Sequence, residues 1–183
     1  MATLKHILRS VFTLFIGGIT MAGNVSGIEW SDLTPYQKHR VTFVLPASST
    51  ETWNADEVQT FLQNYGTRSG IYHSVGMLYR NEGADRENAQ HVMRDLLKLQ
   101  HDVPGEKLHG MWRTGVGKDR EDQNWREFVG TGFIVAREYF GDALAPDLVR
   151  DIDAALVRAA EGAAQRDVSA GYTNIALMSA FLL

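Results

Sequence analysis

The side chains best suited to bind a polar ligand stand at two places where a helix is expected to begin. An aromatic residue and an amide are adjacent at Asn124-Trp125, and the same two types recur at Tyr172 and Asn174. An aromatic ring can stack on the face of a sugar, while amide and guanidinium groups bind hydroxyls or a uronate carboxylate with paired hydrogen bonds. The predicted substrate-binding groove consists of Trp112, Arg113, Asn124, Trp125, Tyr172 and Asn174.

The two helix starts also have a purely structural interpretation. Helix N-termini present unsatisfied N–H groups and a positive dipole end, which attract acids and polar ligands. The same N–H groups can be capped by Asn124 and Thr173, with Trp125 and Tyr172 buried in the core. The sequence leaves both interpretations open.

The predicted groove contains no good general base, so an acid or base has to come from another position. We expect it at Asp122, the predicted catalytic residue, or in sequence beyond residue 183. Glu121 and Glu127 are further carboxylates near the same helix start, and a glycosidase needs two. Charged residues are common at helix ends, so a solvated position is the competing interpretation for all three.

No cofactor and no metal site is predicted. The chain has no cysteine, which excludes disulfides, thiolate metal ligands and a cysteine nucleophile. His101 and His109 flank Pro104-Gly105, but acidic residues at ligand spacing are lacking. Residues 115–118 superficially resemble a phosphate-binding loop, yet they lack its spacing and follow no predicted strand.

Helical periodicity predicts an all-α fold of antiparallel helical hairpins to position these groups. Residues 34–37 have the pattern of a capping box that opens a helix ending before Pro46, although the β-rich segment 41–45 could instead form a strand. Gly66 and Gly70 are expected to interrupt the next helical stretch, which reaches about residue 80. Asp85 is expected to cap a further helix that Pro104-Gly105 ends.

The second half of the chain shows the clearest helices. A long charged connection over about residues 102–122 precedes a helix from Trp125 to Phe140, with Gly141 as its stop. Pro146 begins the following helix, and the short link between the two predicts an antiparallel hairpin. A last apolar stretch runs from Tyr172 to Leu183.

This terminal stretch is apolar almost without interruption from Ile175 to Leu183. It has no polar cap or basic last turn, although helices usually end with such signals. We therefore expect an uncovered apolar surface, self-association through the exposed C-terminal helix, and a chain that corresponds to part of a longer protein. The alternative is a terminal helix that packs into the core.

The N-terminus has the order of a secretory signal peptide. Basic residues at Lys5 and Arg9 precede the apolar segment 11–22 and then small residues. We expect residues 1–27 to be the signal peptide, residues 28–183 to form the secreted domain, and no stable membrane span after cleavage; an uncleaved anchor is the alternative. The net charge of -4 argues against a nucleic-acid partner.

Three segments resemble a family of largely uncharacterised fungal and bacterial proteins. They are Met111-Trp112-Arg113-Thr114, Asn124-Trp125-Arg126-Glu127-Phe128 and residues 171–178. The family is similar to the six-hairpin (α/α) toroid architecture of glycosidases and polysaccharide lyases. The resemblance covers roughly residues 50 to 183 and implies a partial toroid that forms the N-terminal part of that fold. It does not specify a reaction.

Three classes of function follow, because one fold hosts many chemistries. The first is a secreted carbohydrate-active protein, a glycoside hydrolase or polysaccharide lyase, which acts weakly or not at all as this chain. The second is a non-catalytic binding protein for a carbohydrate or other small molecule. The third is an isomerase or dehydratase of secondary, terpenoid-like metabolism. Two carboxylates facing one cleft would favour the first, and a closed apolar pocket would favour the third.

Overall fold

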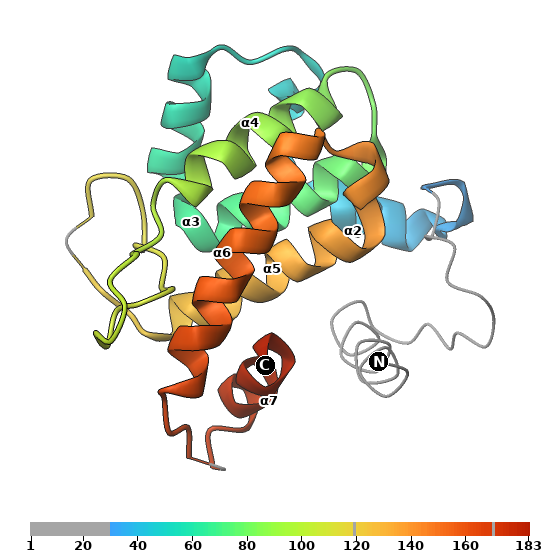
Figure 1. Cartoon of the computed structure of the whole chain (residues 1–183). Helices are drawn as coiled ribbons and strands as arrows, with labels where there is room; N and C mark the ends of the chain where they lie inside the picture. The colour runs from blue at the N-terminus through green and yellow to red at the C-terminus, as the bar shows by residue number, and fades with distance from the viewer. Residues whose placement is uncertain (1–29, 119, 170) are drawn as a thin grey trace.

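A computed structural model describes residues 30–118, 120–169 and 171–183. Its helices are α2 (Pro35–Val44), α3 (Ala55–Arg80), α4 (Asp85–Leu97), α5 (Asn124–Phe140), α6 (Pro146–Ala164) and α7 (Thr173–Leu182), with short 3₁₀ turns η1 (Trp30–Asp32), η2 (Ala47–Thr50) and η3 (Gly141–Ala143). The described residues form no strand, and the predicted all-α class is confirmed (Figure 1). The predicted signal peptide, residues 1–27, lies outside the described residues.

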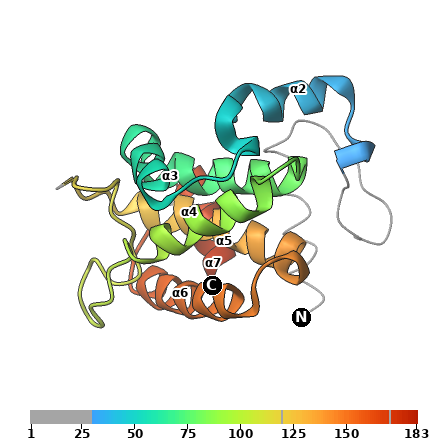
Figure 2. The ribbon, with the colours of Figure 1, turned by 90° about the horizontal axis from the view of Figure 1, so that it is seen from above.

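The first described helix, α2, begins with the predicted capping box. The Gln37 N–H donates to the Thr34 hydroxyl, and the Thr34 N–H donates to the Gln37 side chain. The strand alternative for residues 41–45 is wrong, because the helix continues to Val44. Val41 and Leu45 lie against Gly76 of α3, which holds α2 at the edge of the molecule (Figure 2).

The next two helices, α3 and α4, form an antiparallel hairpin. Gly66 bends α3 without ending it: its φ is 73°, and an added Cβ would lie 2.9 Å from the Thr114 carbonyl oxygen. Gly70 stays helical, so the predicted interruption is a single kink. The Gln59 side chain donates to Asp95 near the far end of the hairpin, 2.7 Å away.

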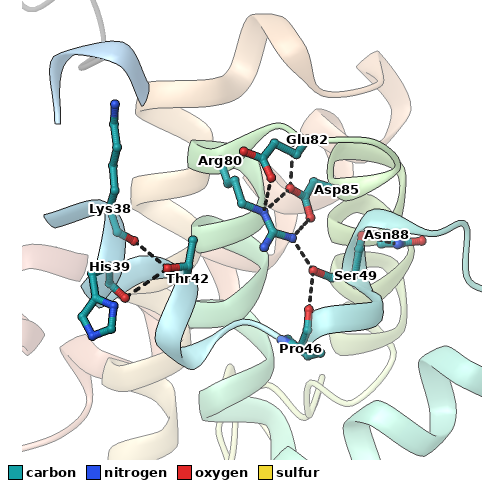
Figure 3. Close-up of polar contacts among 9 residues, drawn as sticks. All are labelled: Lys38, His39, Thr42, Pro46, Ser49, Arg80, Glu82, Asp85 and Asn88. Carbon is teal, nitrogen blue, oxygen red and sulfur yellow. Dashed lines mark hydrogen bonds and ion pairs between the residues drawn. The ribbon is translucent and has the colours of Figure 1, made fainter. Parts of the chain in front are cut away.

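A buried polar network closes this hairpin and attaches η2 to it (Figure 3). Arg80 donates two hydrogen bonds to Asp85, at 2.7 and 2.6 Å, and a third to the Ser49 hydroxyl. The prediction that Asp85 caps α4 is wrong. Ala84 occupies the cap position, and the Asp85 carboxylate accepts instead from Arg80 and from the Glu82 N–H of the connecting turn. Asn88 donates to the carbonyl oxygen of Ser49.

The connection between α4 and α5 starts earlier than predicted. α4 ends at Leu97, not at Pro104-Gly105, because the backbone turns to bond with the returning segment of the loop. The Arg113 N–H donates to the Leu99 carbonyl, and the His101 N–H donates to the Met111 carbonyl. These bonds bring Trp112 into the interior, where it stacks on Phe133 of α5.

The helices α5 and α6 form the predicted antiparallel hairpin. Arg137 of α5 donates to Asp153 of α6 at 2.8 Å. Toward the opposite end, Gly162 of α6 lies against the side chain of Arg126, near the start of α5. α5 ends at Phe140 with Gly141 as its C-cap, as predicted, and Gly141 begins η3 with helical dihedral angles.

Successive hairpins repeat in the same orientation. α3 and α5 run parallel, because their contacts ascend together along both helices: Arg68 with Phe128, Ile71 with Gly132, and Tyr79 with Phe140. α5 and α7 also run parallel, with contacts of Asn124 with Tyr172 and of Gly130 with Leu182. The starts of α5 and α7 therefore lie at the same end of the array.

The terminal helix α7 is better covered than its sequence predicts. Ile175, Met178, Phe181 and Leu182 are buried, and α7 packs against α5 and α6. Only Leu177 and Leu183 remain as exposed large apolar side chains among the residues of α7 and the chain end. Self-association through this helix stays a prediction, and it would depend on these two side chains. In the described part of the chain, no helix has the length and apolar character of a membrane span.

Candidate functional site at the shared start of α5 and α7

The starts of α5 and α7 meet through side chains. The Asn124 amide nitrogen donates to the Tyr172 hydroxyl across 3.1 Å, although the two residues lie 48 positions apart. Asn124 is the first residue of α5, and Tyr172 immediately precedes α7. The two amide–aromatic positions singled out from the sequence therefore contribute to a single surface region.

Arg166 extends this contact toward the interior. It lies in the link between α6 and α7, and its guanidinium donates to the Asn124 side-chain oxygen at 2.9 Å and to Glu127 Oε2 at 3.0 Å. Asp122 adjoins the same helix start. We call these residues the rim cluster: Asp122, Asn124, Glu127, Arg166 and Tyr172.

Glu127 is the buried end of the rim cluster. Its side chain has no solvent exposure, and Oε1 accepts no hydrogen bond from any described residue. Burial raises the pKa of the Glu127 carboxyl, and the nearby positive charge of Arg166 offsets this rise only in part. The site therefore contains a carboxyl whose neutral form is favoured more than in a solvated glutamate.

Asp122 has a different environment. One of its carboxylate oxygens accepts from the Asn124 N–H at 3.0 Å, and the side chain is half-buried. That hydrogen bond satisfies one of the free N–H groups at the start of α5, as a capping carboxylate does. The catalytic role of Asp122 stays a prediction.

Two of the predicted groove residues lie apart from the rim cluster. Trp112 is fully buried in the core between the helices, so its ring presents no face to solvent. Arg113 is exposed, but its backbone is attached to α3 and α4: its carbonyl accepts from the Thr67 hydroxyl, and its N–H donates to Leu99. Arg113 therefore lies beside the kink of α3, and Trp112 precedes it in the loop.

The remaining predicted residues lie close to the rim cluster in sequence. Trp125 is half-buried and packs edge to face against Phe128, whose other contact is the Arg68 guanidinium, 3.9 Å from the ring centroid. Asn174 is exposed in the first turn of α7. Within the described residues, neither side chain forms a hydrogen bond with the Asn124 or Tyr172 side chain.

The sequence did not indicate Arg166, and it left Glu127 as a possible acid–base carboxylate with a solvated helix end as the competing interpretation. Glu127 follows Asn124 by three positions, so both side chains lie on the same face of α5. That spacing was a usable signal for Glu127. Arg166 had no such signal, because only the three-dimensional path of the link between α6 and α7 brings it to α5.

The two loop histidines lie beside carboxylates. His101 lies 3.1 Å from Glu121, and the buried His109 lies 3.0 Å from Glu161 and 3.8 Å from Asp102. No group of three or more His, Asp or Glu side chains is arranged to hold a metal ion within the described ranges. His109 joins the loop to α6, whereas His101 and Glu121 both belong to the connection between α4 and α5.

We predict that Glu127 makes the protein less stable as the pH rises. Below the ordinary glutamate pKa, Glu127 is protonated in both the folded and the unfolded chain, so it does not lower the free energy of unfolding. Above that value the unfolded chain releases the proton first, because the pKa of Glu127 is raised in the folded protein, and the free energy of unfolding falls.

Chemical denaturation of Glu127→Gln from about pH 4 to about pH 8 measures this effect. In the variant, the free energy of unfolding should fall less steeply with rising pH, since Gln keeps an acceptor for Arg166 but does not titrate. Glu138→Gln, an exposed position on the same helix, is the control. An unchanged slope in Glu127→Gln would contradict the prediction.

Comparison with protein families gives one match: a domain of unknown function, DUF8769, matches residues 49–183. The chain belongs to this family. Comparison with curated proteins and with solved structures gives no match. The DUF8769 region contains α3 to α7 and the whole rim cluster, whereas α2 lies outside it.

The start of the DUF8769 region coincides with a structural boundary. Ser49, the first matched residue, is buried and joins Arg80 and Asn88 in the polar network of Figure 3. By contrast, the α2 side chains Tyr36 and Phe43 are largely exposed. The matched region therefore contains the buried network and most of the helical core, to which Leu45 at the end of α2 also contributes.

Proposed function

We propose that the chain is a secreted carbohydrate-active protein, similar to glycoside hydrolases or polysaccharide lyases, with its saccharide site at the rim cluster. Secretion is part of the proposal and is supported by the basic and apolar N-terminal sequence.

The hydrogen bond between Asn124 and Tyr172 is the observation that carries this proposal. It joins an amide and an aromatic ring from two separate helix starts, and 45% of the Tyr172 surface is exposed. A ring of this kind can stack on a sugar, while Asn124 and Arg166 offer donors for hydroxyl or carboxylate oxygens. A sugar presents both an apolar face and hydroxyl groups, which match these two kinds of contact.

The arrangement of hairpins supports the same proposal. In an (α/α) toroid the starts of the inner helices share one end of the fold, and here α5 and α7 start at the same end. We therefore propose that α3 to α7 form part of such a toroid. Because fold alone does not define a reaction, the functional argument depends on the rim cluster.

A non-catalytic binding protein is the second candidate. The observation that favours it is the capping hydrogen bond of Asp122, which already uses one oxygen of the predicted catalytic carboxylate. On this alternative the rim cluster binds a saccharide without transforming it. Catalysis then requires a different carboxyl group.

Replacing Tyr172 by alanine is expected to weaken saccharide binding by at least about tenfold, because the stacking ring is lost. Isothermal titration calorimetry with a panel of neutral and uronate-containing oligosaccharides measures the affinity. The matched control is Tyr36→Ala, which removes a tyrosine that is 70% exposed on α2, away from the rim cluster. Absence of binding by the wild type, or equal affinities for the two variants, would contradict the proposed site.

A further inference from the structure

The two oxygens of Glu127 have different surroundings. Oε2 accepts from the Arg166 guanidinium at 3.0 Å, which fixes the orientation of the carboxyl group. Oε1 is buried and receives no hydrogen bond from the described residues. A buried polar atom without a partner is costly, and in a folded protein it requires an explanation, of which a catalytic role is one. Oε1 is thus the oxygen of Glu127 that has no described hydrogen-bond partner.

A chain of hydrogen-bonded side chains leads from solvent to this carboxyl group. Tyr172 is 45% exposed, its hydroxyl accepts from Asn124, and Asn124 accepts from Arg166, which is 17% exposed and holds Glu127. Because the Glu127 side chain has no solvent exposure, contact between a ligand and Oε1 requires movement of the surrounding side chains. Tyr172 stands in the non-helical residue just before α7, so its side chain can move without unwinding a helix.

We propose that Glu127 is the proton donor, the general acid, of the saccharide site, and that Arg166 is the residue that positions it. This inference rests on the proposed function and adds a specific catalytic group to it. The geometry that supports it is a buried carboxyl, held at one oxygen and free at the other, beside the Asn124–Tyr172 contact.

The step assigned to Glu127 is protonation of the glycosidic oxygen. The proton moves from Oε1 to that oxygen, the bond between the oxygen and the anomeric carbon breaks, and the sugar alcohol leaves. Water supplies the hydroxyl that completes the anomeric carbon, and its proton passes to a second carboxylate, for which Asp122 is the candidate. Arg166 stabilises the Glu127 carboxylate that forms.

The electrostatics of the site agree with this role. Burial raises the pKa of Glu127, so the carboxyl retains its proton to higher pH than a solvated glutamate. A general acid is most effective when its pKa lies near the working pH.

Steady-state hydrolysis of aryl glycosides by wild type and Glu127→Gln tests the proposal. With 4-methylphenyl glycosides, whose leaving group needs a proton, the variant should lose kcat by about 100-fold or more with KM nearly unchanged. With 2,4-dinitrophenyl glycosides, whose leaving group departs without protonation, it should retain most of its kcat. The wild-type kcat should also fall as the pH rises, and the variant should not show that decrease.

Three controls separate this role from a structural one. Glu138→Gln changes an exposed carboxyl on the same helix and should leave both rates unchanged. Glu127→Asp keeps an acid and should recover part of the rate. Thermal melts of all variants verify folding. Equal losses with both leaving groups at normal stability would overturn the proposal.

Carboxyl ¹³C NMR gives a readout that needs no substrate. In the wild type, one glutamate signal should titrate at a higher pH than the other glutamate signals, and it should be absent from Glu127→Gln. If Glu127 titrates at or below the ordinary glutamate pKa, the proposal is overturned regardless of activity. If Glu127→Gln turns over 4-methylphenyl glycosides as fast as the wild type, only the role of Glu127 is contradicted. If the wild type turns over no glycoside and no uronate polymer, the proposed enzyme and its general acid are both contradicted.

Discussion

Replacing Asp85 by alanine is expected to lower the free energy of unfolding by about 3–5 kcal/mol, because it removes the buried partner of the Arg80 charge. The remaining anionic partner of Arg80 is the exposed Glu82 carboxylate, which lies 3.8 Å from Nε. Asp85 is fully buried and accepts two hydrogen bonds from Arg80 and one from the Glu82 N–H. The same guanidinium also holds Ser49 at the start of the DUF8769 region. Loss of Asp85 should therefore loosen η2 together with the α3–α4 turn.

Urea unfolding, monitored by circular dichroism, measures this change. The matched control is Asp147→Ala, which breaks the solvent-exposed pair of Asp147 with Arg94 on α4 and should cost far less. Equal losses in the two variants would show that the network of Figure 3 does not carry the stability assigned to it.

Gly162→Ala should destabilise the protein by about 2 kcal/mol or more, although alanine is the better helix former. Gly162 lies inside α6, where an added Cβ would stand 2.0 Å from the His109 carbonyl oxygen and 2.7 Å from Arg126 Nε. Those two groups are themselves bonded, since Arg126 donates to the His109 carbonyl. The methyl group would thus separate the loop from both α5 and α6.

The melting temperatures of Gly162→Ala and Gly141→Ala provide the comparison. Gly141 has helical dihedral angles, and its added Cβ would meet mainly the mobile end of the Arg137 side chain. Alanine should therefore be tolerated there. A melting temperature of Gly162→Ala equal to or above the wild type would contradict the close packing of loop, α5 and α6.

The helices could be predicted because their signals are local. The apolar period of α5, with Val129, Phe133 and Ala136 on one face, corresponds to the residues that the structure buries. Pro146 marks the start of α6 in the same way. Such periodicity depends only on the neighbouring residues, so no knowledge of the tertiary structure was required.

The positions that could not be predicted depend on contacts between distant segments. Trp112 is buried because residues 98–101 bond to the returning loop, which also ends α4 early. Asp85 forms a salt bridge instead of a cap because Arg80 lies opposite it across the turn. Such pairings have no period in the sequence.

The candidate site could be predicted in part, because the repeated helical hairpins could be predicted. Parallel stacking of α5 and α7 follows from repeated hairpins, and it places Asn124 beside Tyr172. The partner of Glu127 could not be predicted, because Arg166 lies 39 positions away on a non-helical link. The pKa of Glu127 is raised by burial, which is a property of the fold and not of the local sequence.

The most direct test of a saccharide site at the rim cluster is a ¹H–¹⁵N NMR titration of the protein with oligosaccharides that include uronates. We expect one saccharide to shift the side-chain amide of Asn124 and the backbone amides near the starts of α5 and α7, and Tyr172→Ala to remove these shifts. Shifts confined to other helices, or none with any saccharide at millimolar concentration, would contradict a saccharide site at the rim cluster.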